Sequence, residues 1–328
     1  CLSVMGIARE VAAITNTKLR AYSVERIADS KTYLSAKRYP LNAKILKIEI
    51  EDKKDCPLYI AKIIRGVKVA ASPEWLKQRL ELIGCRSINN IVDITNYIMF
   101  AWGQPLHAFD LDRFDSDRVI VRRGKSGEKL MVIDGQQKTL DADILVIANR
   151  HNPVAIAGVM GGQDTEVTQG SKNILLEAAV FNPALVRCGR RKLGLESESS
   201  YRFERGIDLE KVEFASSECV RLIQELTKGK RVFNKSSARF KAKAKKINLD
   251  ITHVQKILGM DNISQGKIKN ILDNLGFKAR AKAKNNLAVE IPSWRQDVSL
   301  EADLIEEIAR ILGYENIPTT LPAIITKP

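Results

Sequence analysis

The sequence predicts an α+β protein with more than one domain, and three observations support this. Its 328 residues are 45% hydrophobic, which is enough apolar mass for two or three cores. Helical periodicity alternates with short runs rich in Val and Ile through the middle of the chain. A shorter segment with three helical patterns then follows a strongly basic stretch. We therefore expect a mixed α/β domain followed by a small α+β domain.

The first 57 residues predict only one helix and one strand. The helix is expected from Leu2 to Thr15, and the strand at Ile45–Ile50, before Cys56 and Pro57. This is too little for a complete domain, and the chain starts at Cys1 inside the predicted helix. We therefore expect it to be a piece of a longer protein.

A mixed α/β pattern runs from residue 58 to about 225. A strand at 59–64 leads to a helix with Ser72 as expected N-cap, Pro73 at its first position and Gly84 as its stop. Its expected apolar face consists of Trp75, Leu76, Leu80 and Ile83. The second helix is expected at 90–101, and strands at 119–121, 129–133, 144–148, 155–159 and 174–178.

The last segment, from about residue 246 to 321, predicts a small α+β domain. Its terminal helix is expected from Leu300 to Leu312, with Ser299 as the N-cap and Gly313 as the stop. Residues 228–246 before it hold nine Lys and Arg and no acid. This stretch predicts a solvated linker or an exposed edge between the domains.

Composition excludes several classes of protein. The 53 Lys and Arg against 39 Asp and Glu give a net charge of +14, which suits a polyanion such as nucleic acid, or simply a solvated surface. The five Cys form no C-x-x-C pair and there are three His, so a disulfide scaffold or structural zinc is not expected. No eighteen-residue apolar run, secretion signal, P-loop or G-x-S-x-G motif occurs. A cytoplasmic protein without a membrane partner is expected.

Four ordered motifs carry a resemblance. They are Ser87–Tyr97 with Gly103–Asp110, Ala157–Gly162 with Leu175–Ala179, Ser199–Asp208, and Pro292–Val298 with Asp303–Glu307. Together they are similar to the signature of the bacterial phenylalanyl-tRNA synthetase beta subunit family, over nearly the whole chain.

The resemblance implies a domain plan and partners. Residues 1–57 would be the end of the subunit's first module, 58–240 its editing domain, 241–247 a basic linker, 248–321 a small winged-helix-like domain related to DNA-binding folds, and 322–328 a tail. The aminoacylation site would belong to an alpha subunit in an alpha2beta2 tetramer that binds tRNA(Phe). Mg²⁺ would be held together with the alpha subunit, and ATP would be used by the whole enzyme but not bound by these residues.

The resemblance also implies a reaction, which is post-transfer editing by hydrolysis of mis-acylated Tyr-tRNA(Phe). An apolar pocket rejects an added hydroxyl by only about a hundredfold, so a second pocket that hydrogen-bonds the hydroxyl is needed. One alternative is a non-catalytic structural or tRNA-docking module of the beta subunit. Another is a nucleic-acid binder that acts through the small C-terminal domain.

Glu177 is the expected acceptor for the tyrosine phenol. It interrupts an apolar run, 174–180, on or next to the predicted strand, where an unpaired buried carboxylate costs several kcal/mol. The alternatives are a salt bridge to Arg187 or Arg190, or exposure on a strand edge.

His107, Thr95 and Asn96 are the expected substrate-orienting residues. His107 follows the turn 103–105, where a loop can present it, and its near-neutral pKa suits orienting a water or binding the ester. A structural hydrogen bond is the alternative. Thr95 and Asn96 lie one helical turn beyond Ile91 and Val92, and helix packing is their alternative role.

Four further residues complete the expected editing site. Gly158 and Gly161 allow close backbone approach and amide donation to an oxyanion, although a Gly-rich run is also a common turn. Arg86 could hold the terminal tRNA phosphate. Ser197 falls where many relatives carry Thr beside the pocket.

Acidic residues near the end of the chain form a candidate Mg²⁺ set. Asp303, Glu306 and Glu307 have i, i+3, i+4 spacing, and Asp297 precedes Ser299. Solvated acids at a helix N-terminus are the alternative; the resemblance favours Mg²⁺ shared with the alpha subunit.

Overall fold

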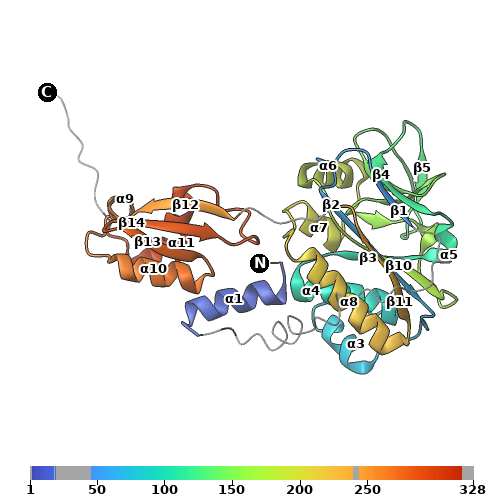
Figure 1. The fold of residues 1–328 in the computed structure, drawn as a ribbon, viewed down its shortest axis with the longest axis horizontal. Coiled ribbons are helices and arrows are strands. Elements are labelled where there is room, and N and C mark those ends of the chain that lie inside the picture. The colour runs from blue at the N-terminus through green and yellow to red at the C-terminus, as the bar shows by residue number, and fades with distance from the viewer. Residues whose placement is uncertain (1, 18, 20–45, 239–243, 320–328) are drawn as a thin grey trace. The chain divides into compact units, whose positions relative to one another are not determined.

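The computed structural model describes residues 2–17, 19, 46–238 and 244–319 (Figure 1). These residues form two compact units: 2–6 and 46–238 in the first, and 7–17, 19 and 244–319 in the second. The expected helix near the N-terminus is α1 (Val4–Ile14). The mixed α+β architecture predicted from the sequence is therefore confirmed.

Two larger sheets and the two-stranded sheet of β5 (Lys129–Met131) and β6 (Gln137–Thr139) build the first unit. One larger sheet has the order β1-β4-β7-β8-β9, in which β1 is parallel to β4 and all other pairs are antiparallel. The other is antiparallel with the order β11-β2-β10-β3. The strands of the first are β1 (Lys47–Ile50), β4 (Arg118–Arg123), β7 (Leu145–Ala148), β8 (Pro153–Ile156) and β9 (Met160–Gly161); those of the second are β2 (Leu58–Arg65), β3 (Leu106–Asp110), β10 (Asn173–Val180) and β11 (Lys230–Ser236).

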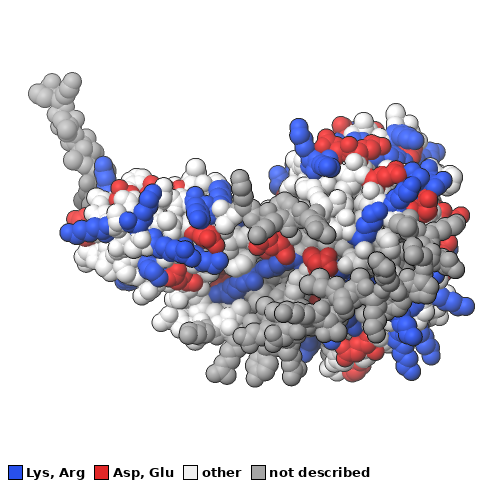
Figure 2. All heavy atoms as spheres, in the orientation of Figure 1, with Lys and Arg blue, Asp and Glu red and all other residues white. Residues whose placement is uncertain are grey.

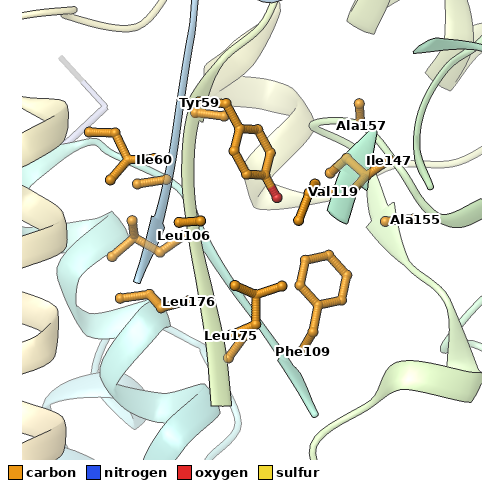
Figure 3. Packing of buried hydrophobic residues seen from close by; sticks show 14 of the residues in the cluster. Tyr59, Ile60, Leu106, Phe109, Val119, Ile147, Ala155, Ala157, Leu175 and Leu176 are labelled. Atoms are coloured by element: carbon orange, nitrogen blue, oxygen red, sulfur yellow. The ribbon is translucent and has the colours of Figure 1, made fainter. Parts of the chain in front are cut away.

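The two faces of the four-stranded sheet have different neighbours. Side chains alternate between faces along a strand, so Tyr59, Phe109 and Leu175 project to one side and Ile60, Leu106 and Leu176 to the other (Figure 3). The first side faces Val119 and Ala155 of the five-stranded sheet. Helices α4 and α8 pack against the other. The result is three layers with a continuous apolar core.

The helices of the first unit begin and end at recognisable signals. The Asn89 side chain accepts hydrogen bonds from the amides of Ile91 and Val92 at the start of α4, and Gly103 ends that helix with φ +81°. The α-helices of the unit are α3 (Glu74–Glu81), α4 (Asn90–Trp102), α5 (Leu111–Phe114), α6 (Pro183–Leu193), α7 (Glu198–Phe203) and α8 (Val212–Thr227), with a 3-10 turn at Gln163–Thr165.

Two predictions about α3 are wrong. Pro73, not Ser72, is the N-cap, because the Ser72 hydroxyl donates to Asp93 of α4 instead. Only Leu76 and Leu80 of the expected apolar face are buried, whereas Trp75 is 39% and Ile83 46% exposed.

Strand boundaries differ from the predicted ones where glycine intervenes. The strand expected at 155–159 ends at Ile156, since Gly158 has φ +71°. The strand expected at 129–133 is β5 (Lys129–Met131), which ends two residues earlier and pairs antiparallel with β6 (Gln137–Thr139). Residues 230–236 of the basic stretch form an edge strand, β11, so the linker interpretation does not apply to them. Ile45, Arg239, Lys241 and Lys243 lie outside the described residues.

The second unit is a three-stranded antiparallel sheet with helices. The strand order is β12-β14-β13, with β12 (Lys245–Asp250), β13 (Lys278–Ala283) and β14 (Asn286–Ile291). Its helices are α9 (Ile251–Leu258), α10 (Gln265–Asn274) and α11 (Glu301–Leu312), followed by a 3-10 turn at Tyr314–Asn316. Ser299 is the expected N-cap of α11, but the N-cap is Leu300. The Asp303 carboxylate accepts hydrogen bonds from the backbone amides of Ser299 and Leu300.

Charge is distributed over both units. On the face that Figure 2 shows, Lys and Arg are interspersed with Asp and Glu rather than gathered in one basic patch. Among the described residues, no helix has the length and apolarity needed to cross a membrane.

Candidate functional site

A pocket of about 270 Å³ opens between the two larger sheets of the first unit. This volume is near the lower end of the range for small-molecule sites, roughly 300–1,000 Å³. We call it the Glu177 pocket. Its lining is mostly apolar, with polar groups from four elements; it includes Ile88, Val92, Thr95, Asn96, His107, Ile147, Ile156, Gly158, Met160, Gly161, Glu166, Glu177, Ser197, Ser199 and Phe203.

Glu177 reaches the pocket through the register of the four-stranded sheet. It lies on central strand β10, opposite Ala61 of β2 and His107 of β3. Residues directly opposite share a face, so Glu177 and His107 both point towards the five-stranded sheet. Glu177 is only 5% exposed. The sequence-based expectation that this carboxyl is buried on a strand is confirmed.

The partner of Glu177 is a tyrosine. The Tyr59 hydroxyl donates a hydrogen bond of 3.1 Å to Oε2 of Glu177. The alternative prediction, a salt bridge from Glu177 to Arg187 or Arg190, is wrong, because both arginines pair with Glu204. Burial raises the pKa of Glu177 to about 8, even though the bond from Tyr59 acts to lower it. An empty pocket therefore holds a carboxyl that is largely protonated at neutral pH.

His107 is on a strand rather than in the expected loop. It belongs to β3, and its ring makes an edge-to-face contact with Phe109, with centroids 4.5 Å apart. Burial lowers the pKa of His107 to about 4. At neutral pH the imidazole is thus uncharged, with one nitrogen that donates and one that accepts a hydrogen bond.

The two glycines play different structural roles. At Gly161, an added Cβ would lie 2.6 Å from Cε1 and 2.7 Å from Nε2 of His107, so the absence of a side chain lets the imidazole pack against β9. Gly158 has φ +71°, and an added Cβ there would meet Phe203, Phe181 and Val186 at 3.0–3.1 Å. The glycine-rich segment therefore shapes the pocket wall.

Thr95, Asn96 and Ser197 line the same pocket. The Thr95 hydroxyl donates to the carbonyl of Val92, 2.7 Å away in its own helix, so towards a ligand Thr95 can act only as an acceptor. Ser197 is the N-cap of α7, accepting from the amide of Ser200, and its hydroxyl donates to the carbonyl of Val159 at 2.7 Å. Ser197 thus ties α7 to the glycine-rich segment.

Arg86 is the one predicted editing-site residue outside the pocket lining. It is exposed in the loop before α4. The loop is held by Asp93, which is fully buried and accepts from the hydroxyls of Ser72 and Ser87 and the amide of Ile88. Sequence reasoning missed both Asp93 and Tyr59. A signal existed for each: Asp93 lies inside the first family motif, and Tyr59 is a polar side chain in an apolar strand.

The expected Mg²⁺ residues are engaged with other groups. Asp297 pairs with Arg295 at 2.6 Å, and Glu307 with Arg295 at 2.9 Å and Arg310 at 2.7 Å. Asp303 caps α11, and Glu306 is exposed. Within residues 2–17, 19, 46–238 and 244–319, no three His, Cys, Asp or Glu side chains are grouped to hold a metal ion. The acids of this chain, as arranged here, do not fit a Mg²⁺ site on their own.

Comparison with known proteins identifies the class. Residues 55–228 match the B3/4 domain, which covers the Glu177 pocket, and residues 247–314 match the tRNA synthetase B5 domain. This pair places the chain among the aminoacyl-tRNA synthetases. The chain belongs to the family of phenylalanine–tRNA ligase beta subunits, as the resemblance predicted.

Three relatives show the extent of the similarity. The chain is 44% identical over 329 residues to the phenylalanine–tRNA ligase beta subunit of Carboxydothermus hydrogenoformans, covering 99% of this chain and 39% of that protein. Identity is 43% to the subunit of Halalkalibacterium halodurans and 42% to that of Bacillus subtilis strain 168, each over 98% of this chain and 39% of the relative. The chain therefore spans about two fifths of its relatives' length.

A solved structure also matches. It is an N-terminal fragment of the phenylalanyl-tRNA synthetase beta subunit from Pyrococcus horikoshii, with TM-score 0.39 and 15% identity over 82% of this chain and 75% of that chain. At this TM-score the match carries no weight for the fold.

Proposed function

We propose that the Glu177 pocket hydrolyses the ester of mis-acylated Tyr-tRNA(Phe) and so edits the product of a phenylalanine–tRNA ligase. The observation that supports this best is a buried carboxyl in the lining of a small, mostly apolar pocket. Such a pocket accommodates an aromatic ring, and it binds a ring with a hydroxyl more tightly because the carboxyl can hydrogen-bond that hydroxyl.

Glu177 selects tyrosine over phenylalanine through the cost of an unpaired polar group. The tyrosine phenol hydrogen-bonds the Glu177 carboxyl, whereas phenylalanine displaces solvent and leaves the carboxyl without that partner. A buried group left unsatisfied costs about 1–3 kcal/mol, more when charged. Sites built to bind a hydroxyl reject the analogue without it by about 10⁴ or more.

Hydrolysis needs only water as the nucleophile. The water oxygen attacks the ester carbonyl carbon, and the electron pair of the C=O bond moves to oxygen to form an oxyanion. Collapse of this intermediate breaks the bond to the ribose oxygen, which takes up the proton that the attacking water gives up. Free tyrosine and uncharged tRNA leave. The backbone amides of Gly158 and Gly161 are the proposed oxyanion donors, because the amides of Ala157, Val159 and Gly162 already donate to backbone carbonyls.

The other polar residues orient the substrate. His107 is neutral at pH 7 because burial lowers its pKa to about 4, so it accepts from or donates to the water or ester rather than acting as a strong base. Thr95 offers only acceptor capacity to a ligand, which suits the α-ammonium group of the aminoacyl ester. Asn96 lies beside Thr95 in the lining and can anchor the ribose. Arg86, exposed two residues before the pocket-lining Ile88, contacts the terminal phosphate.

The rest of the proposal concerns the whole enzyme. An alpha subunit in an alpha2beta2 tetramer would supply aminoacylation with ATP in the cytoplasm, and both subunits would bind tRNA(Phe). Mg²⁺ would require ligands from that subunit in addition to Asp297, Asp303, Glu306 and Glu307, because in this chain three of these acids are already engaged. The three helices and antiparallel sheet of the second unit support the winged-helix-like description.

Deacylation of purified Tyr-tRNA(Phe) and Phe-tRNA(Phe) tests the proposal. The wild-type chain is expected to hydrolyse the tyrosyl ester preferentially, and Glu177→Ala to lose that preference. Glu166→Ala is a matched control, since Glu166 also lines the pocket but is exposed at its edge. It should retain the preference.

Two outcomes would contradict the proposal. An unchanged tyrosine preference in Glu177→Ala would remove Glu177 from selection. A wild-type chain that binds tRNA but hydrolyses neither ester, even when assembled with an alpha subunit, would favour the non-catalytic docking module.

A further inference from the structure

Tyr59 lies behind Glu177 and is fully buried. It is opposite Ala179 on β10, so it is a diagonal neighbour of Glu177 on the same face of the sheet. Figure 3 shows its ring extending from β2 towards Val119 of the neighbouring sheet, with the hydroxyl at the far end. Tyr59 itself is not among the pocket-lining residues.

The Tyr59 hydroxyl donates a hydrogen bond to one of the two oxygens of the Glu177 carboxyl. Its bond to Oε2 is 3.1 Å long, and no other hydrogen bond to the Glu177 carboxyl is found among the described residues. A carboxyl has two oxygens that accept hydrogen bonds in fixed directions. Holding Oε2 from behind restricts rotation of the carboxyl and leaves Oε1 for the pocket.

We infer that Tyr59 is a positioning residue that fixes the Glu177 carboxyl for recognition of the substrate phenol. The inference rests on the proposed function and deepens it, because it assigns the discrimination between tyrosyl and phenylalanyl esters to a pair of residues. Tyr59 does not touch the substrate. It presents one oxygen of Glu177 to a hydroxyl-bearing ring and keeps the other satisfied when the pocket is empty.

Three ionisable groups face Glu177, and they determine how its charge responds to pH. Tyr59 lies on β2, His107 on β3, and the buried thiol of Cys56 just before β2. Burial raises the pKa of both Tyr59 and Cys56, and Glu177 raises it further. Both therefore stay neutral near pH 8, where Glu177 titrates. Of these three, only Tyr59 donates a hydrogen bond to Glu177, so its removal should raise the pKa of Glu177.

Tyr59→Phe is the variant that tests the inference, because it removes only the hydroxyl. We expect the ratio of kcat/KM for Tyr-tRNA(Phe) over Phe-tRNA(Phe) to fall about 2- to 10-fold, as for a lost hydrogen bond between uncharged groups. The pH profile of that ratio should break at a higher pH than in the wild type. Tyr97→Phe is the matched control. The Tyr97 hydroxyl accepts a hydrogen bond of 2.9 Å from Arg79, and Tyr97 does not line the pocket. Neither the kcat/KM ratio nor its pH profile should change in this variant.

A double-mutant cycle with Glu177→Ala, which removes both acceptor oxygens, separates positioning from a general loss of stability. Once Glu177 is replaced, Tyr59→Phe should have no further effect on the ratio. Additive effects, or a single variant with the wild-type ratio and pH profile, would overturn the inference. If the wild-type chain itself showed no tyrosine preference, the proposed function would fail instead, so the two failures are distinguishable.

Discussion

Glu177 on β10 lies directly opposite His107 on β3, and both side chains face one pocket. Burial moves their pKa values in opposite directions, raising that of Glu177 to about 8 and lowering that of His107 to about 4. Both groups are therefore mostly neutral at pH 7. An apolar pocket that keeps its ionisable groups uncharged avoids the cost of burying charge and retains their hydrogen-bonding capacity.

The raised pKa of Glu177 predicts that stability falls with pH between 6.5 and 8. The folded state holds this proton up to about pH 8, whereas the unfolded state loses it near 4.5, so unfolding releases a proton throughout this window. Compared with Glu177→Gln, the wild type should lose about 2 kcal/mol of unfolding free energy over these 1.5 pH units. Urea titrations across the range measure this. A constant difference between the two proteins would contradict the raised pKa.

The lowered pKa of His107 predicts the opposite slope at acid pH. Unfolded His takes up a proton below about 6.5, while the folded state resists it until about 4. Stability contributed by neutral His107 is therefore present above pH 6.5 and lost as the pH falls towards 4. In the same titrations, the stability advantage of the wild type over His107→Asn should shrink as the pH falls from 6.5 to 4, a difference to which Glu177 contributes equally in both proteins, whereas the difference from His151→Asn, at an exposed residue, should stay constant. Equal acid limbs in all three proteins would argue against burial of a neutral imidazole.

Gly161→Ala should displace His107 from the pocket wall. The added methyl would lie 2.6 Å from the imidazole, so the ring must move. We expect roughly a 10- to 100-fold loss of ester hydrolysis, with about 1–3 kcal/mol of destabilisation from overpacking. Gly170→Ala is the control, since its nearest contact would be an ordinary 3.8 Å. Wild-type deacylation by Gly161→Ala would show that the position of His107 is unimportant.

Asp93→Ala should destabilise the first unit and loosen the pocket rim. It leaves two hydroxyls and the Ile88 amide without their buried acceptor, at an expected cost of about 3–5 kcal/mol. Asp134→Ala, in an exposed turn, should change stability by only about 0.5 kcal/mol. Denaturant unfolding compares the two, and similar small effects would mean that the Asp93 network contributes little.

Ser197→Ala should cost about 1 kcal/mol, as for other lost helix N-caps. The substitution removes the acceptor for Ser200 and the donor to Val159. Ser197→Thr keeps a hydroxyl at the same position and should remain close to wild-type stability. Equal losses in both variants would indicate that packing, rather than the hydroxyl, matters at this residue.

Local signals predicted most elements of the fold, and failures occurred where a distant residue competed. Ser72 has the right type and place for an N-cap, but Asp93, 21 residues away, takes its hydroxyl. A hydroxyl that donates to a buried carboxylate elsewhere in the fold does not cap the helix next to it in sequence.

The site was predictable in its residue types but not in its geometry. The apolar run around Glu177 indicated a buried carboxyl, yet its partner Tyr59 lies 118 residues earlier in the chain, and only the register of β2 against β10 brings them together. The contact of Gly161 with His107 depends on the packing of one sheet against the other, and no local pattern encodes this. Arg187 and Arg190 are nearer to Glu177 in sequence than Tyr59 is, but they form ion pairs with Glu204.

The position of the substrate ring tests the central claim most directly. A crystal structure of this chain with a non-hydrolysable tyrosyl-adenosine amide would locate the phenol in the Glu177 pocket. We predict a phenol oxygen about 2.5–3.0 Å from Oε1 of Glu177, as for hydrogen bonds between hydroxyl and carboxyl oxygens, with Tyr59 still bonded to Oε2. A tyrosyl ring bound elsewhere, or bound with its hydroxyl away from Glu177, would contradict the account.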